Sequence, residues 1–164
     1  MTDRDEAFAE YFAARSSALR ATAFLLCGDW HRAEDLVQQT FTKLYLRWNR
    51  VQRHESLDPY ARRVLISTFI DEGRWGWWRR ERPQETRIDR AAAPEPSDDR
   101  VTLLGALARV PARQRAVLVL RYWQDLSVEE TAAALGCSAG TVKSQAARGL
   151  DTLRTLVAHP VNAD

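Results

Sequence analysis

The stretch LSVEETAAALGCSAGTVKSQAARGLDTL (residues 126–153) predicts two helices joined by a tight turn. Ser127 is followed three residues later by Glu130, the spacing of a capping box, in which each side chain satisfies a free backbone N–H at a helix start. Gly136 can take the left-handed conformation that ends a helix. Ser138 can then cap a second helix. We therefore expect one helix over about residues 128–135 and another after residue 138.

These two helices have the pattern of a helix-turn-helix. Helices joined by so tight a turn cross at a steep angle, and we expect the small side chains of Ala132 and Ala133 to form the contact. The inward stripe of the second helix follows helical spacing and consists of Val142, Ala146, Gly149 and Leu153. The opposite face consists of Gly140, Thr141, Ser144, Ala147, Arg148 and Asp151, with Lys143 and Gln145 on its flanks. Small and polar residues beside one arginine suit a DNA major groove, where arginine pairs with guanine. The alternative is an ordinary helical hairpin with a solvated face.

Composition allows one domain or two small ones, because the chain has 164 residues, 45% of them hydrophobic. The net charge of +2 gives no overall basic field, and the basic residues are nearly all arginine, which fits phosphate contacts and equally a GC-rich genome. Cys27 and Cys137 are isolated and lack ligand spacing to the three histidines, so we expect reduced thiols and no metal site. The absence of a long apolar run or signal-peptide pattern predicts a cytoplasmic protein that does not enter a membrane.

The first half of the chain shows helical spacing twice. Apolar residues recur from Asp5 to about Cys27, after which Gly28 ends the pattern and Asp29 can cap the next helix. The inward stripe of that next helix is Ala33, Leu36, Val37, Phe41, Leu44 and Trp48. Its other face is Glu34, Asp35, Gln38, Gln39, Thr42 and Lys43. Such a face is usually solvated, but it could also receive a basic helix of a partner protein.

The polar segment from Arg50 to Asp58 is expected to be a loop. Asp58 and Pro59 then predict a third helix that starts at the proline. Proline has no backbone N–H, and at the first helical position this costs nothing because an N–H there has no partner within the helix. The stripe of this helix is Ala61, Val64, Leu65, Thr68 and Phe69. Near its end, GRWGWWRRERP (residues 73–83) interleaves three tryptophans with arginine and glycine. This mixture indicates a stacking surface for unpaired bases, with burial of a tryptophan in the core as the alternative.

The rest of the chain predicts a linker followed by a second helical unit. Residues 83–99 are rich in proline and alanine, which predicts a flexible linker between a domain at residues 1–82 and a domain at residues 100–158. The second domain has four helices, since an apolar pattern begins at Val101 and restarts after Pro111. No strand pattern, phosphate-binding glycine loop or catalytic arrangement of acids with His or Ser is visible. The sequence predicts an all-α fold of two small domains, without cofactor, metal or enzymatic activity.

Three motifs resemble a bacterial RNA polymerase sigma factor: AEDLVQQTF (residues 33–41), the Trp- and Arg-rich segment before the linker, and residues 107–154. The likeness spans nearly the whole chain and is to the small extracytoplasmic-function group, of the actinobacterial SigE-like type. The last motif is shared with some response regulators, whereas the first singles out sigma factors. The resemblance implies a sigma-two helical bundle and a sigma-four helix-turn-helix domain, joined by a linker that lies in the RNA path of the polymerase. It also implies a role in promoter recognition and DNA opening.

The resemblance assigns roles to particular residues. Those implied to bind core RNA polymerase, through its beta-prime coiled coil, are Glu34, Asp35, Gln38, Gln39 and Phe41. Those implied to read and melt the downstream promoter element are Arg53, His54, Ser67, Trp75, Arg79 and Arg80. Those implied to read the upstream, minus-thirty-five element are Thr141, Lys143, Ser144, Gln145, Ala147 and Arg148. The beta flap of the polymerase and an anti-sigma factor are further partners to be expected.

Two departures from the family pattern fall on the third helix. Ser67 and Thr68 stand where many relatives have Asn-Thr facing the melted strand, and Asp71 and Glu72 lie where basic residues are more usual. A competing interpretation is a helix-turn-helix repressor or activator with an N-terminal helical effector domain. That interpretation gives the Trp- and Arg-rich segment no role, and co-purification with core polymerase separates the two.

Overall fold

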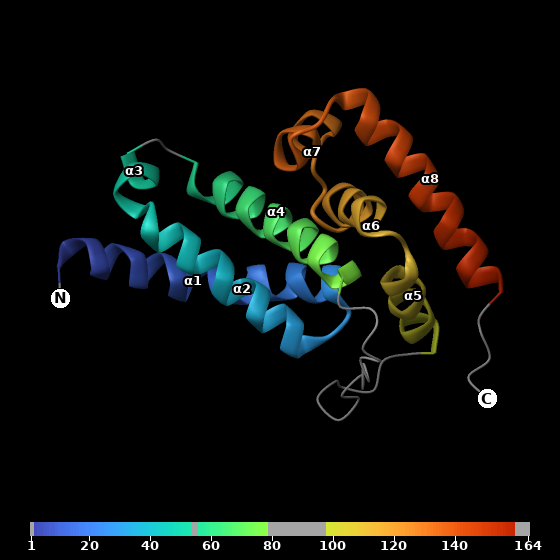
Figure 1. Ribbon diagram of the computed structural model, residues 1–164, viewed down its shortest axis with the longest axis horizontal. Helices are drawn as coiled ribbons and strands as arrows, with labels where there is room; N and C mark the ends of the chain where they lie inside the picture. The colour runs from blue at the N-terminus through green and yellow to red at the C-terminus, as the bar shows by residue number, and fades with distance from the viewer. Residues whose placement is uncertain (1, 54–55, 79–97, 160–164) are drawn as a thin grey trace.

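The computed structural model describes residues 2–53, 56–78 and 98–159, which form helices and no strand (Figure 1). The all-α fold expected from the sequence is therefore confirmed. The first half contains α1 (Asp3–Cys27), α2 (Trp30–Leu46), α3 (Trp48–Arg53) and α4 (Leu57–Trp78). The second half contains α5 (Asp98–Arg109), α6 (Ala112–Leu118), the π-helical turn η2 (Val119–Trp123), α7 (Val128–Leu135) and α8 (Ala139–Ala158). None of these helices is both long enough and apolar enough to span a bilayer.

The turn between α1 and α2 forms as its residue types predict. Gly28 takes a left-handed conformation with φ of 75° and ends α1, while the Asp29 side chain accepts a hydrogen bond from the backbone N–H of His31 and caps α2. The two helices then pack along one another. Phe8 of α1 meets the rings of Phe41 and Trp48 edge to face, so an aromatic cluster holds the first half together.

The prediction of a loop from Arg50 to Asp58 is wrong for most of these residues. Residues 50–53 belong to the short helix α3, and α4 begins at Leu57, so Pro59 is its third residue rather than its first. Trp48 and Val51 lie three residues apart and are both buried, which means that packing holds the polar segment in a helical turn. Pro59 remains within the first turn, where a backbone N–H has no partner inside the helix. Residues 54 and 55 lie outside the described residues.

The second half contains the expected helix-turn-helix. Ser127 and Glu130 form the predicted capping box, in which the Glu130 N–H donates to Ser127 Oγ at 3.0 Å and the Ser127 N–H donates to Glu130 Oε1 at 3.1 Å. Gly136 ends α7 with φ of 67°, as expected. The predicted contact at the helix crossing is half right, because Ala132 packs with Val142 in a small hydrophobic cluster whereas Ala133 is exposed.

The chain between α6 and α7 contains a π-helical turn that the sequence pattern did not predict. The turn η2 widens the end of α6, and the Arg121 side chain donates a hydrogen bond to the backbone carbonyl of Leu126 across the following loop. Tyr122 and Trp123 are exposed there, whereas Leu120 is fully buried. The two exposed rings therefore point away from the core that Leu120 enters.

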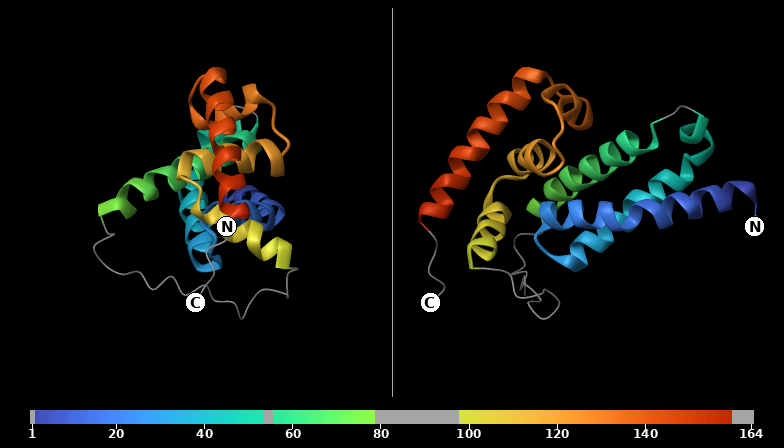
Figure 2. Two further views of the ribbon diagram at one scale, coloured as in Figure 1. Left: turned by 90° about the vertical axis from the view of Figure 1, so that its right-hand side faces the viewer. Right: turned by 180° about the vertical axis from the view of Figure 1, so that it is seen from behind.

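The two halves share a continuous hydrophobic core. Leu26 and Phe69 of the first half lie in the same cluster of buried residues as Leu107, Leu120 and Leu126 of the second half. Helix α7 packs against α4, and α5 packs against α1 (Figure 2). The linker is predicted at residues 83–99. Its last two residues, 98 and 99, begin α5, and the rest of it lies outside the described residues. The structure thus places side by side two units that are separated in sequence.

Candidate nucleic-acid interface

Helix α8 is held in place by its cap and by two buried positions. Ser138 Oγ accepts a hydrogen bond from the Thr141 N–H at 3.1 Å, which fixes the start of the helix as predicted. Val142 is fully buried against α7. Gly149 lies so close to α6 that an added Cβ would meet three side-chain atoms of Leu118 at 3.1–3.3 Å. This close approach fixes the outward face of α8 relative to the rest of the second half.

The structure gathers the residues predicted to read the upstream element on that outward face. Those that are exposed are Lys143, Ser144, Ala147 and Arg148. Thr141 and Gln145 are partly buried, and the Thr141 hydroxyl lies 2.9 Å from Ser138 Oγ, so it is engaged in the helix cap. The face accordingly presents two cations and small side chains, a combination that fits base edges and phosphates.

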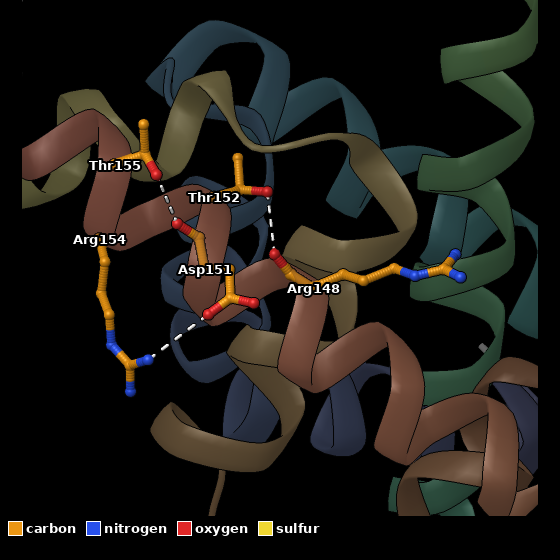
Figure 3. A network of polar contacts seen from close by, with 5 residues as sticks. All are labelled: Arg148, Asp151, Thr152, Arg154 and Thr155. Atoms are coloured by element: carbon orange, nitrogen blue, oxygen red, sulfur yellow. Dashed lines mark hydrogen bonds and ion pairs between the residues drawn. The ribbon is translucent and has the colours of Figure 1, made fainter.

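The side chain of Arg148 extends away from the polar contacts that follow it on α8 (Figure 3). Asp151 forms an exposed ion pair with Arg154 at 3.5 Å, and the hydroxyls of Thr152 and Thr155 donate to backbone carbonyls one turn earlier. Arg148 forms no ion pair with another described residue. Its guanidinium is consequently available to an external acceptor, whereas the nearest acid on the helix already has a cation beside it.

The polar face of α2 is divided between paired and open residues. Glu34 forms an ion pair with Arg20 of α1 at 2.9 Å, and Gln39 Nε2 donates to Glu72 Oε1 of α4 at 2.6 Å. Asp35 is exposed and has no ion-pair partner among the described residues, and Gln38 is exposed beside it. An external partner would meet these two residues without breaking an internal contact.

Phe41 does not lie on the α2 surface with the other residues implied to bind polymerase. Only 4% of its surface is exposed, and its ring packs against Phe8, Tyr11 and Phe12 of α1. Because the Phe41 ring is already buried within the first half, it lies beneath the polar face of α2 and supports that face.

The residues predicted to act on the downstream element are only partly described. Ser67 is exposed on α4, and its hydroxyl donates to the backbone carbonyl of Val64 at 3.1 Å. The Lys43 ammonium donates to Thr68 Oγ1 at 2.8 Å, which brings a cation next to the Ser67 position. Trp75 lies in the last turns of α4, and its side chain is not described. The side chain of Arg53, and all of His54, Arg79 and Arg80, also lie outside the described residues.

The start of α4 is anchored by contacts that sequence reasoning missed. Asp58 accepts a hydrogen bond from the Tyr11 hydroxyl at 2.9 Å and forms an ion pair with Arg15 at 2.9 Å. Tyr11 and Arg15 both belong to α1. Burial, together with the hydrogen bond to Asp58, raises the pKa of Tyr11 well above its usual range. Ser56, just before the helix, has φ of 64°, which is uncommon for a residue other than glycine. The one feature of the sequence that could have indicated these contacts is the polar hydroxyl of Tyr11 within an otherwise apolar stripe.

Comparison with known proteins decides the family. Residues 12–82 match the family model described as Sigma-70 region 2, and residues 100–153 match the model described as Sigma-70, region 4. The RNA polymerase sigma-E factor of Streptomyces coelicolor is 40% identical over 163 residues, which cover 95% of this chain and 89% of that relative. This chain belongs to the sigma-70 family of RNA polymerase sigma factors. It falls in the extracytoplasmic-function group, as the resemblance implied.

Further relatives of this sigma factor agree in sequence and in fold. The extracytoplasmic-function sigma factor SigE of Mycolicibacterium smegmatis is 32% identical over 146 residues, which cover 83% of this chain and 56% of that relative. The sigma factor RpoE of Bartonella quintana, solved in complex with the anti-sigma factor NepR, has a TM-score of 0.73 at 26% identity and covers 94% of this chain and 99% of its own. CnrH, solved with the cytosolic domain of CnrY, gives a TM-score of 0.64 at 19% identity and covers 94% of this chain and 89% of its own, which shows the fold.

The family gives this sigma factor its function and its principal partners. It binds core RNA polymerase and promoter DNA and directs the initiation of transcription. Sigma factors as a class are non-enzymatic regulators of initiation. The repressor or activator interpretation is not favoured, because the match to region 2 accounts for the first half of the chain.

Proposed function

We propose that the outward face of α8 reads the upstream promoter element in the major groove, with Arg148 as the principal base contact. The observation that carries this assignment is the exposed guanidinium of Arg148, which pairs with no acid among the described residues, on a helix fixed by Val142 and Gly149. Arginine pairs with guanine through two parallel hydrogen bonds, and each such contact contributes about 1–3 kcal/mol of discrimination. Lys143 and Ser144 flank this contact and bind the phosphate backbone.

Core polymerase docks on the polar face of α2. Asp35 and Gln38 form the centre of this surface, since their neighbours Glu34 and Gln39 are engaged with α1 and α4. By the family resemblance, the partner element is the beta-prime coiled coil, and the second half contacts the beta flap. An aspartate with no ion-pair partner in the described part of the chain suits a basic helix of the polymerase.

The downstream element is read and opened between the end of α3 and the exposed side of α4. Ser67 contacts an unpaired base. Lys43 of α2 donates to Thr68, the next residue of α4, and from there it attracts the phosphate of the melted strand. Arg53 and His54 capture a base at the start of this region. Trp75, Arg79 and Arg80 contact the duplex just upstream.

This sigma factor acts in the cytoplasm, carries out no catalysis of its own and is held inactive by an anti-sigma factor. Support for the last point is the fold shared with RpoE of Bartonella quintana, which was solved with the anti-sigma factor NepR.

In-vitro transcription with core polymerase, followed by mapping of start sites, tests the assignment. We expect start sites only when the protein and core polymerase are both present. Failure to co-purify with core polymerase, with DNA binding retained, would instead support the repressor or activator function.

A further inference from the structure

The outward side of α4 carries a row of exposed residues. Every fourth position of this helix from residue 59 to residue 71 is exposed. Residues four positions apart lie one above the other on a helix surface, so the row is continuous. We call it the α4 ridge, and it consists of Pro59, Arg63, Ser67 and Asp71. The ridge ends in an acid, although the DNA that α4 is proposed to contact is a polyanion.

The two neighbouring acids of α4, Asp71 and Glu72, have different surroundings. Glu72 is partly buried, and its Oε1 accepts a hydrogen bond from Gln39 Nε2 of α2 at 2.6 Å, so this carboxylate joins two helices of the first half. Asp71 is exposed, and its carboxylate forms no hydrogen bond or ion pair with another described residue. Packing within the protein therefore explains Glu72, whereas the carboxylate of Asp71 is open to a donor from outside.

The proposed function of α4 places Asp71 between two parts of the promoter. Ser67 is assigned to an unpaired base, and Trp75, four residues beyond Asp71, is assigned to the duplex just upstream. At a rise of about 1.5 Å per residue, the four residues from Ser67 to Asp71 span about 6 Å of the helix. This length corresponds to roughly two base steps along one strand. Asp71 therefore faces the first base pairs upstream of the melted bases.

The chemistry of a carboxylate limits what Asp71 can bind there. An ionised aspartate accepts hydrogen bonds and donates none, and phosphates repel it. In the major groove, guanine presents the acceptors N7 and O6, thymine presents O4, and adenine presents N7 beside its amine. Cytosine presents only its N4 amine, which is a donor. Cytosine is thus the one base whose major-groove edge offers a carboxylate a donor without an acceptor beside it.

We propose that Asp71 is a specificity-determining residue, which accepts a hydrogen bond from the N4 amine of a cytosine at the upstream edge of the melted region. This inference rests on the proposed function of α4. Any other base at this position turns an acceptor toward the carboxylate and is rejected. A basic residue, which is more usual in this part of the family, would instead bind phosphate on any sequence. Asp71 therefore adds selectivity where a cation would add affinity.

In-vitro transcription with core polymerase on a set of promoters tests this role. The set carries each of the four base pairs at each of the paired positions next to the melted region. Asp71→Asn keeps the shape of the side chain, removes its charge and adds a donor, whereas Asp71→Ala removes the acceptor altogether. Glu72→Gln is the matched control, because it removes the same charge from the adjacent residue, whose side chain contacts α2. Circular dichroism checks that helical content is unchanged.

We expect the wild-type protein to prefer cytosine at one of these positions by about fivefold or more. Asp71→Asn should move the preference to adenine, because an amide pairs with both N6 and N7 of that base. Asp71→Ala should show no preference there, and Glu72→Gln should keep that of the wild type. An equal rise in activity on all templates with both Asp71 variants would mean that Asp71 only repels phosphate. That result, or an unchanged preference in both variants, would overturn the inference.

Ser67→Ala separates a failure of this inference from a failure of the proposed function. If Ser67→Ala impairs transcription from duplex promoters while both Asp71 variants keep the wild-type base preference, α4 faces the DNA and only the role of Asp71 is wrong. If neither Ser67→Ala nor the Asp71 variants change transcription on any template, the assignment of α4 to the downstream element fails together with this inference.

Discussion

Arg115 of α6 donates a 2.6 Å hydrogen bond to the backbone carbonyl of Leu26, which is 89 residues away in sequence. Its other guanidinium nitrogens bind carbonyls of its own half. One side chain thus links the ends of two helices, and the planar fork of arginine is what allows several carbonyls to be reached at once.

Replacement of Arg115 by lysine should destabilise the protein although the charge is kept. A single ammonium cannot reach the carbonyls of Leu26, Ala108 and Val110 together, and hydrogen bonds to charged groups contribute about 1.5–3 kcal/mol each. We expect the free energy of unfolding in urea to fall by about 2 kcal/mol. The matched control is Arg113→Lys on the same helix, where the side chain is exposed and the change should be small. Equal stabilities of the two variants would mean that the hydrogen bonds of Arg115 do not hold the two halves of the protein together.

Charge reversal at Asp35 should weaken the binding of core polymerase. The Asp35→Arg variant loses an exposed acid that has no ion-pair partner among the described residues, so helical content should not change. The expected loss is about 2 kcal/mol or more where the charge pair with the polymerase is desolvated. Glu10→Arg, an equal charge reversal on the exposed side of α1, is the control. Unchanged co-purification of the Asp35 variant would place the docking surface elsewhere.

Removal of the Arg148 side chain should relax base choice at one position of the upstream element. Arg148→Ala is expected to cost roughly 1–3 kcal/mol in binding to the preferred sequence and little on sequences altered at that position. Arg154→Ala, which removes a paired arginine further along α8, should leave sequence preference unchanged. An equal loss on all upstream sequences would mean that Arg148 contacts phosphate instead of a base.

Alanine at both Arg53 and His54 should impair the opening of duplex promoters more than transcription from opened ones. Flipping a base costs a few kcal/mol, and the capture of that base must offset the cost. On a template mismatched over the melted region, activity should partly return, because the strands no longer have to be separated. Run-off transcription from the two templates measures the difference. Equal loss on both would assign these residues to folding or docking.

Two glycines in the second half should respond oppositely to a larger side chain. Gly149→Val forces branched atoms against Leu118, where even a Cβ would lie at 3.1–3.3 Å, and overpacking of this kind costs about 1–3 kcal/mol. Gly105→Ala in α5 has no neighbour within 4 Å and should add up to about 1 kcal/mol through helix propensity. Thermal unfolding measures both. A neutral Gly149→Val would mean that α8 is less closely held than the structure indicates.

Local chemistry explains which features could be predicted from the sequence. The capping box of Ser127 and Glu130, the left-handed Gly136 and the cap at Ser138 depend on residues within a few positions of one another. The inward position of Val142 follows from helical spacing alone. The exposed face of α8 could be predicted for the same reason.

Features that depend on distant residues could not be predicted in this way. Residues 50–53 are polar, and only the burial of Trp48 and Val51 against the first half keeps them helical. Ile66 lies outside the predicted stripe of α4, because a second surface covers it, and that surface comes from the other half of the chain. The sequence contains no local sign that Arg115 binds a carbonyl of α1.

The continuous core has a consequence for recombining sigma factors. Two domains joined only by a linker could be exchanged between relatives as interchangeable modules. Here, consider a chimera that keeps residues 1–78 and takes its second half from a relative. The carbonyl of Leu26 would lose its hydrogen-bond donor and Thr22 would lose its partner, unless the relative's second half carries equivalents of Arg115 and Gln124. Transplanted promoter specificity should therefore depend on matched residues between the two halves as well as on the recognition helix. The two halves are expected to evolve together.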